Sequence, residues 1–183
     1  MSGHGHVDPS NKKIALLISL LALVLAFSET LGKAAQTEAL AQNIEASNLW
    51  NFFQAKTIRM TVLRTAGESL ASELGPQAGE AHKAQITKWK ETAERYDSEP
   101  STGEGRKELA ARAKAAEARR DRSMAAYHQY ELASGAVQIA IVLASATIIT
   151  GMNALAWVAG GLGLLGIAFS LIGFFAPTAV HLF

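Results

Sequence analysis

The sequence has no cysteine, only four prolines, and long stretches without a charged side chain. The absence of cysteine excludes disulfides, thiolate zinc sites, iron–sulfur clusters and a cysteine nucleophile. The 17 basic and 16 acidic residues leave a formal net charge of +1, which gives no reason to expect a nucleic-acid surface. A chain of 183 residues forms one or two domains.

Charge is distributed unevenly along the chain. No Asp, Glu, Lys or Arg occurs in residues 14–27 or in residues 132–183. All but three of the charged residues therefore lie in residues 28–131. This distribution is typical of a membrane protein with a charged middle.

Two apolar segments near the end of the chain, 132–150 and 154–176, predict membrane helices. Both reach the length of about 20 residues that a helix needs to cross roughly 30 Å of hydrocarbon. Helices are favoured over strands because every backbone polar group must be bonded internally in lipid. Gly151-Met152-Asn153 leaves room only for a tight hairpin between them. We expect Gln138 to lie near an interface or to bond a neighbouring helix.

The first apolar run, residues 14–27, would be about 21 Å long as a helix and is too short to span alone. Continuation to Gly32 supplies the missing length, so we expect a signal-anchor-like membrane helix over 14–32. A cleaved signal peptide is the alternative, because Lys12-Lys13 precedes the run and Ala26-Phe27-Ser28 resembles a signal-peptidase site.

Glu29 would then lie at the membrane edge. With Gln138 it is a candidate intramembrane polar group, since carboxylates in spanning segments are often functional. The favoured interpretation is that Glu29 reaches the interface and pairs with Lys33, four residues further on.

The charged middle predicts helices and no strand. Residues 28–74 contain no proline, and steps of three and four residues pick out a mostly apolar seam, typical of a coiled coil. The seam comprises Ala35, Ala39, Gln42, Ala46, Leu49, Phe53, Lys56, Met60, Leu63, Gly67, Leu70 and Leu74. Gly75-Pro76 should end this helix. A second helix over 77–96, a loop over 97–105 and a third helix from Arg106 would complete an antiparallel helical projection.

Trp50, Phe52 and Phe53 form the densest aromatic group. Trp50 and Phe53 share one helix face, whereas Phe52 points elsewhere. We expect these projection contacts to pack against the returning helix and a second subunit. A ligand groove or a partner anchor is the alternative.

The last apolar segment carries a stripe of small residues, again at steps of three and four. The stripe comprises Ala156, Ala159, Gly163, Gly166, Ser170 and Gly173. Small side chains allow two helix backbones to approach closely, which is how membrane helices associate. We therefore expect helix packing or an oligomer contact here. The partner is either the first arm of the same hairpin or another subunit.

Motifs for catalysis are missing from the sequence, including a P-loop, GxSxG and HExxH. Residues 161–166 match only the letters of a dinucleotide fingerprint, since no strand precedes them. His4 and His6 could offer a copper or nickel site, but a solvated tail is the favoured interpretation. We predict a protein that is not an enzyme and that has no cofactor and no metal site.

The order of segments resembles an uncharacterised family of bacterial membrane proteins. The resemblance is strongest over residues 42–59, where the family shows a similar succession of Ala-Ser, Trp and aromatic-Gln-Ala-Lys. It covers nearly the whole chain. The resemblance implies the architecture and a bacterial origin, and it implies no reaction because the family has no agreed activity.

These features predict an all-α integral membrane protein with three transmembrane helices and a long, coiled-coil-like helical projection. The expected segments are a tail (1–13), membrane helices (14–32, 132–150 and 154–176), an extramembrane helical hairpin (33–131) and a second tail (177–183). The first helix usually sets orientation, so Lys12 and Lys13 place the N-terminus in the cytoplasm and the projection in the periplasm of a bacterial inner membrane.

The expected function is structural: a membrane assembly, scaffold or accessory subunit that forms homo-oligomers and interacts through its helical projection. Its partners would be membrane lipid, other copies of the chain and a larger membrane complex, but not nucleic acid. The alternative is a channel or transporter subunit, with a path lined by Glu29, Gln138 or the oligomer axis.

Overall fold

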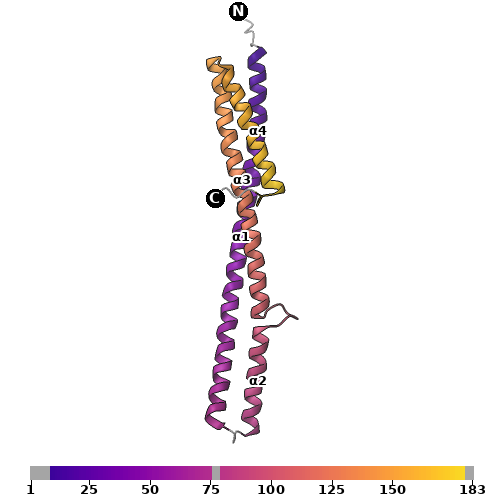
Figure 1. Ribbon diagram of the computed structural model, residues 1–183, viewed down its shortest axis with the longest axis vertical. Helices are drawn as coiled ribbons and strands as arrows, with labels where there is room; N and C mark the ends of the chain where they lie inside the picture. Colours follow the sequence, from indigo (N-terminus) through magenta and orange to yellow (C-terminus); the bar gives the residue numbers. More distant parts are fainter. Residues whose placement is uncertain (1–8, 76–78, 180–183) are drawn as a thin grey trace, which may run out of the picture. The chain divides into compact units, whose positions relative to one another are not determined.

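The computed structural model describes residues 9–75 and 79–179, which form four helices and no strand. The helices are α1 (Pro9–Leu74), α2 (Glu80–Asp97), α3 (Arg106–Thr150) and α4 (Asn153–Phe175), as Figure 1 shows. The predicted all-α fold is confirmed. Three of the helices, α1, α3 and α4, are long and apolar enough to cross a membrane.

The helix ends lie where turn-forming residues predict them. α1 ends at Leu74, and Gly75 follows with a φ of 56°, a left-handed conformation that favours glycine. α3 runs without a break from Arg106 into the apolar segment. Gly151 ends it with a φ of 71° and donates its N–H to the carbonyl oxygen of Thr147 at 2.9 Å. The connection to α4 is therefore a tight hairpin.

The chain divides into two compact units. Unit 1 combines Met1–Leu40 with Asp121–Phe183, and unit 2 is Ala41–Arg120. Both divisions fall inside continuous helices, α1 and α3, and neither falls at a loop. The packing of each unit follows from its own residues.

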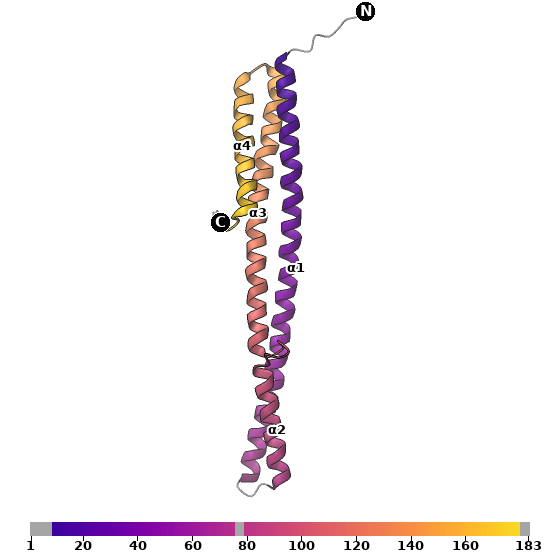
Figure 2. The same ribbon diagram turned by 90° about the vertical axis from the view of Figure 1, so that its right-hand side faces the viewer.

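In unit 1, α1, α3 and α4 lie side by side (Figures 1 and 2). One cluster of buried side chains between them is aliphatic: Ile14, Leu21, Val137, Ala140, Ala144 and Ala159. Large apolar side chains point outward instead, among them Leu16, Leu20, Phe27, Trp157, Leu164 and Phe174. Many exposed large apolar side chains on neighbouring helices are typical of contact with lipid or with another protein.

In unit 2, α1 packs first against the beginning of α3 and then against α2. Leu49, Leu109 and Ala113 form the centre of this core, with Trp50 and Phe53 beside them. Every position of the predicted seam from Gln42 to Leu74 is buried or half-buried. The seam is therefore the face that α1 turns toward the returning helices of its own chain.

Candidate functional sites

The small residues of α4 lie against α1 and α3 of the same chain. A side chain at Gly163 would meet the Cδ2 atom of Leu21 at 2.5 Å, so α1 passes directly over this glycine. A side chain at Gly166 would collide with Val137 and would approach the carbonyl oxygen of Ala133 at 3.1 Å. Glycine at these positions allows the helices to pack this closely.

The same stripe continues in both directions along α4. Ser170 and Ser28 of α1 form a hydrogen bond between their hydroxyl groups, with 2.8 Å between the oxygens. Gly173 leaves room for Tyr130 of α3, whose ring would lie 3.2 Å from an added Cβ atom. Ala159 is fully buried, and Ala156 is half-buried. The predicted stripe is thus a packing surface within the subunit, and its partners include α1 as well as the first arm of the hairpin.

Glu29 and Gln138, the two candidate intramembrane polar residues, come together in unit 1. The amide Nε2 atom of Gln138 donates to Glu29 Oε1 at 3.3 Å, and both side chains are exposed. Gln138 therefore bonds a neighbouring helix, one of the two roles that the sequence predicts for it. Glu29 makes its hydrogen bond across to α3, which the sequence did not indicate.

A shallow groove of about 230 Å³ lies beside this contact. It is lined by Ser28, Glu29, Gly32, Lys33, Gln36, Tyr127, Tyr130, Glu131 and Ser134. Glu131 accepts a long hydrogen bond of 3.5 Å from the hydroxyl group of Tyr127, and it lies 3.7 Å from His128 Nδ1. The groove combines charged, aromatic and hydroxyl groups at the edge of the apolar helices.

The aromatic projection contacts have two roles in unit 2. The indole N–H of Trp50 donates to Glu117 Oε1 on α3 at 2.8 Å, and its ring meets Phe53 edge-on at 5.4 Å between centroids. Phe52 points elsewhere, with 38% of its surface exposed, and lies 5.4 Å from the ammonium of Lys56. Trp50 and Phe53 thus pack against the returning helix, whereas the expected contact with a second subunit stays a prediction.

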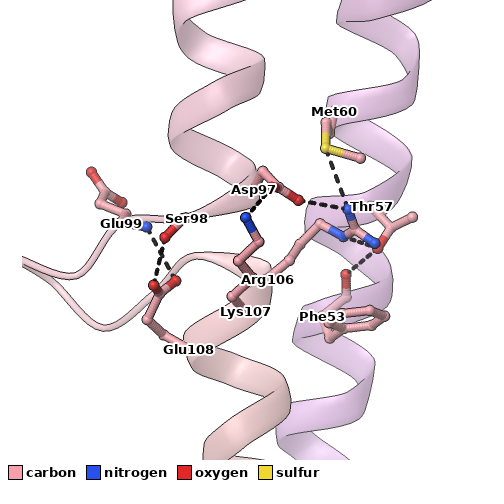
Figure 3. A network of polar contacts seen from close by, with 9 residues as sticks. All are labelled: Phe53, Thr57, Met60, Asp97, Ser98, Glu99, Arg106, Lys107 and Glu108. Carbon is pink, nitrogen blue, oxygen red and sulfur yellow. Dashed lines mark hydrogen bonds and ion pairs between the residues drawn. The ribbon is translucent and has the colours of Figure 1, made fainter.

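Arg106, the first residue of α3, ties the returning helices to α1 (Figure 3). Its Nε atom donates to Thr57 Oγ1 at 2.8 Å, and its Nη1 atom donates to Asp97 Oδ1 at 3.0 Å. Its guanidinium group also stacks 4.9 Å over the ring of Phe53. Lys107 completes the cluster with an ion pair of 2.9 Å to Asp97. One arginine thereby fixes the ends of two helices against a third.

This cluster changes the titration of Asp97. A hydrogen bond and charge attraction from Lys107, with the charges of Arg106 and Arg64, hold the pKa of that carboxyl below its usual value, although partial burial opposes the shift. No pattern in the sequence predicts this cluster. Its only signal was that Asp97 and Arg106 flank a loop rich in turn residues.

The loop between α2 and α3 is held by Glu108 (Figure 3). Its carboxylate accepts the hydroxyl of Ser98 at 2.7 Å and the backbone N–H of Glu99 at 3.1 Å. These hydrogen bonds lower the pKa of Glu108, chiefly through Ser98. Gly105 lies so close that an added Cβ atom would collide with Glu108 Oε2 and with the backbone of Glu99. The loop is therefore a defined structure that depends on this glycine.

Lys56 is the one seam position with a charge, and only 8% of its side chain is exposed. Its ammonium lies 5.0 Å from the ring of Tyr96 and 3.9 Å from Glu104 Oε2. Aromatic faces and a carboxylate together stabilise a desolvated ammonium. This position explains why a lysine interrupts an otherwise apolar seam.

A second groove, of about 530 Å³, lies between α1 and α2 in unit 2. It is lined by Leu63, Arg64, Gly67, Glu68, Ala71, Ile86, Lys90, Ala93 and Glu94. An added Cβ atom at Gly67 would meet nothing within 4 Å, so the space in front of this buried glycine is open.

Over residues 9–75 and 79–179, no group of three or more His, Asp or Glu side chains is placed to hold a metal ion. His4 and His6, the candidates from the sequence, lie outside the described residues.

The fold defines a class: an all-helical protein with three helices long and apolar enough to span a membrane, and with a second unit of charged helices. The family described as Domain of unknown function (DUF4337) matches residues 10–176. The chain belongs to this family, which confirms the resemblance that its sequence indicates. No curated protein and no solved structure matches the chain.

Proposed function

We propose that this chain is a non-enzymatic subunit of the bacterial inner membrane that assembles with other copies and serves as a scaffold or accessory component. Unit 1 inserts in the bilayer, and the charged helices of unit 2 supply the interaction surface. The N-terminus lies in the cytoplasm and the loop between α2 and α3 in the periplasm.

One contrast carries the proposal. The large apolar side chains of unit 1 are turned outward, with Leu164 70% exposed and Phe174 62% exposed. In water this surface would cause aggregation, whereas in lipid it needs no cover. In unit 2 the polar side chains bond groups of the same unit, since Arg106 bonds Asp97 and Glu108 bonds Ser98. These polar contacts support a structural role.

The test is extraction of the full chain from native membranes in lipid nanodiscs, followed by a mass measurement. We expect resistance to alkaline carbonate and particles that contain more than one 19.4 kDa chain. Release by carbonate would refute membrane insertion. A lone chain without any associated protein would refute the assembly role.

Orientation has its own test at Ser101, which is exposed in the loop between α2 and α3. Because the chain has no native cysteine, Ser101→Cys provides a single thiol. An impermeant maleimide should label it in intact spheroplasts. Labelling only after lysis would place the loop in the cytoplasm.

A channel or transporter subunit is the second candidate, and the contact between Glu29 and Gln138 favours it. Polar groups that meet on spanning helices are often part of a path for ions. Proteoliposomes separate the two candidates. The scaffold role predicts no more ion flux than empty vesicles show, whereas flux that Glu29→Ala abolishes would establish the path.

A further inference from the structure

The outward face of α1 in unit 2 differs from the rest of that unit. The large apolar side chains exposed on the described part of unit 2 are Ile44, Phe52, Ile58 and Val62, and all four belong to α1. Neither α2 nor the first part of α3 exposes one. α1 therefore offers a surface for which the other helices have no counterpart.

Three of these four side chains, all but Phe52, lie on one stripe along the helix together with exposed polar residues. We call it the outer stripe. The outer stripe comprises Ile44, Ser47, Asn51, Gln54, Ile58, Thr61 and Val62, all of them exposed. Ile44, Asn51 and Ile58 recur every seven residues, which keeps them within about 40° of one another on an α-helix. The stripe lies away from the buried seam, so α1 has two seams on different faces.

Charge is excluded from the outer stripe. Over Ala41–Val62, α1 carries three charged residues. Lys56 is buried, Glu45 lies 3.9 Å from Arg112 of α3, and Arg59 lies about 100° around the helix from the preceding stripe residue. By contrast, the first part of α3, Arg106–Arg120, carries eight charged residues. A face left in water needs no such exclusion, so the pattern indicates that something covers it.

We propose that the outer stripe pairs with the outer stripe of a second copy of this chain, with the two α1 helices parallel and in register. The parallel direction rests on the proposed function, because two copies inserted in one membrane with the same orientation present α1 in the same direction. In register, each isoleucine meets its equivalent and Asn51 meets Asn51.

The chemistry of the stripe favours a copy over a different protein. Identical surfaces placed face to face repel each other when they carry charge, and this stripe carries none. An asparagine amide has both a donor and an acceptor, so it can pair with its own equivalent. Ile44, Asn51 and Ile58 occupy the same position in successive heptads. In coiled coils, isoleucine at the first heptad position favours parallel two-stranded pairing, and a single asparagine there fixes the register.

The pairing is weaker than in a leucine zipper. The intervening positions are Ser47, Gln54 and Thr61, which bury little apolar surface. Anchorage in one membrane compensates, because it raises the effective concentration of one copy around another.

Single cysteines test this pairing in the membrane-embedded full chain. Ile58→Cys places equivalent Cα atoms about 6 Å apart, a separation that disulfides favour. Arg59→Cys, one residue further on, is the matched control and turns away from the partner. We expect Ile58→Cys to form a dimer on mild oxidation at least about tenfold faster than the control.

Asn51→Cys determines the direction of pairing. Antiparallel helices centred on residue 51 would also cross-link at Asn51→Cys, but they would place Ile58 opposite Ile44. Rapid cross-linking at both Asn51→Cys and Ile58→Cys supports the proposal. Cross-linking at Asn51→Cys alone overturns it, and so does a product that is not a dimer of the 19.4 kDa chain.

Ile58→Asp adds a second measurement that does not depend on oxidation. It places equal charges in contact across the pair, so the oligomeric fraction should fall, while Arg59→Asp should leave it unchanged. Both side chains are exposed, so neither change disturbs the fold of the subunit. If the wild-type chain is oligomeric but Ile58→Asp has no effect, the outer stripe is not the interface, although the proposed assembly function stands.

Discussion

The two units pack their helices in different ways. In α4 of unit 1, Gly163 and Gly166 are buried and Leu164 is exposed, and many large apolar side chains of this unit point outward. Unit 2 buries leucine and methionine at Leu49 and Met60, and α2 and α3 expose charge. Most of the exposed large apolar side chains therefore belong to unit 1, and those of the described part of unit 2 lie on α1 alone.

This difference indicates that each unit is stabilised by a different physical term. In unit 2, removal of apolar surface from water favours association of the helices. In unit 1 this term vanishes if lipid surrounds the helices, so close contact and hydrogen bonds such as Ser28–Ser170 must supply the attraction. Substitutions of glycine can separate the two stabilising terms, because a new Cβ atom shows directly whether two helices are in close contact.

Gly166→Leu in unit 1 should cause the largest loss of folding stability. The new side chain would collide with Val137, and its Cβ atom would lie only 3.1 Å from the carbonyl oxygen of Ala133, so α3 and α4 must move apart. We expect a destabilisation of about 3 kcal/mol, near the upper end for overpacking. Thermal unfolding in a mild detergent, followed by circular dichroism, should show the midpoint lowered by several degrees.

Gly161→Leu is the matched control on the same helix. An added Cβ atom at Gly161 meets nothing within 4 Å, and the residue is exposed. The control should unfold near the wild-type midpoint. Equal effects of the two substitutions would mean that close approach of α4 does not stabilise unit 1.

Gly105→Ala in unit 2 should have a smaller effect. The added methyl group would collide with the Glu108 carboxylate and the backbone of Glu99, so the loop must shift and lose its hydrogen bonds. We expect a loss of about 2 kcal/mol. Hydrogen exchange of the full chain should show faster exchange at the end of α2 and the start of α3.

Gly67→Ala is the control in the same unit, and it should stabilise the fold where Gly105→Ala destabilises it. The space in front of Gly67 is open, and alanine is favoured over glycine inside a helix by up to about 1 kcal/mol. Gly67→Ala should therefore slow hydrogen exchange slightly in α1. If Gly105→Ala were equally harmless, the loop would not be the fixed structure that its contacts indicate.

The parts of the fold that the sequence predicted depend on local signals. Gly75 and Gly151 end helices because they adopt the left-handed conformation, and runs of helix formers predict what lies between them. The sequence also predicted the small-residue stripe of α4, because the spacing of these residues places them on one face of a helix.

The partners of these residues could not be predicted in the same way. Ser170 and Ser28 are 142 residues apart in the sequence, and no local pattern relates them. Glu29 illustrates the same limit: the sequence favoured Lys33 as its neighbour on the helix, whereas the hydrogen bond goes to Gln138 on α3. Such contacts depend on the register between helices, which many distant side chains determine together.

The cluster around Arg106 is unpredictable from the sequence for the same reason. Its donors and acceptors come from α1, the end of α2 and the start of α3. Each residue by itself is an ordinary polar residue near a loop. Only the pairing of Thr57 with the beginning of α3 turns them into a site.

The smallest predicted effect is a response to acid that is confined to unit 2. The buried side chains of the described part of unit 1 include no Asp, Glu, Lys or Arg, whereas Asp97 and Glu108 of unit 2 have lowered pKa values. A lowered pKa in the folded state stabilises the fold above the ordinary carboxyl pKa of about 4. That contribution is lost as the pH falls through the folded-state pKa. Between about pH 5 and pH 2, hydrogen exchange corrected for its intrinsic pH dependence should therefore accelerate first around the α2–α3 loop.

Glu108→Gln isolates the titration from the packing. The amide oxygen can still accept one of the two hydrogen bonds from Ser98 and Glu99, but the side chain no longer takes up a proton. The variant should exchange faster than wild type at neutral pH and change less on acidification, because its carboxylate contribution is already gone. Glu80→Gln, at an exposed carboxylate on α2, should keep the wild-type acid response. An acid response that begins in the apolar helices of unit 1 would reverse the comparison, since it would place the sensitive groups where no carboxylate is buried.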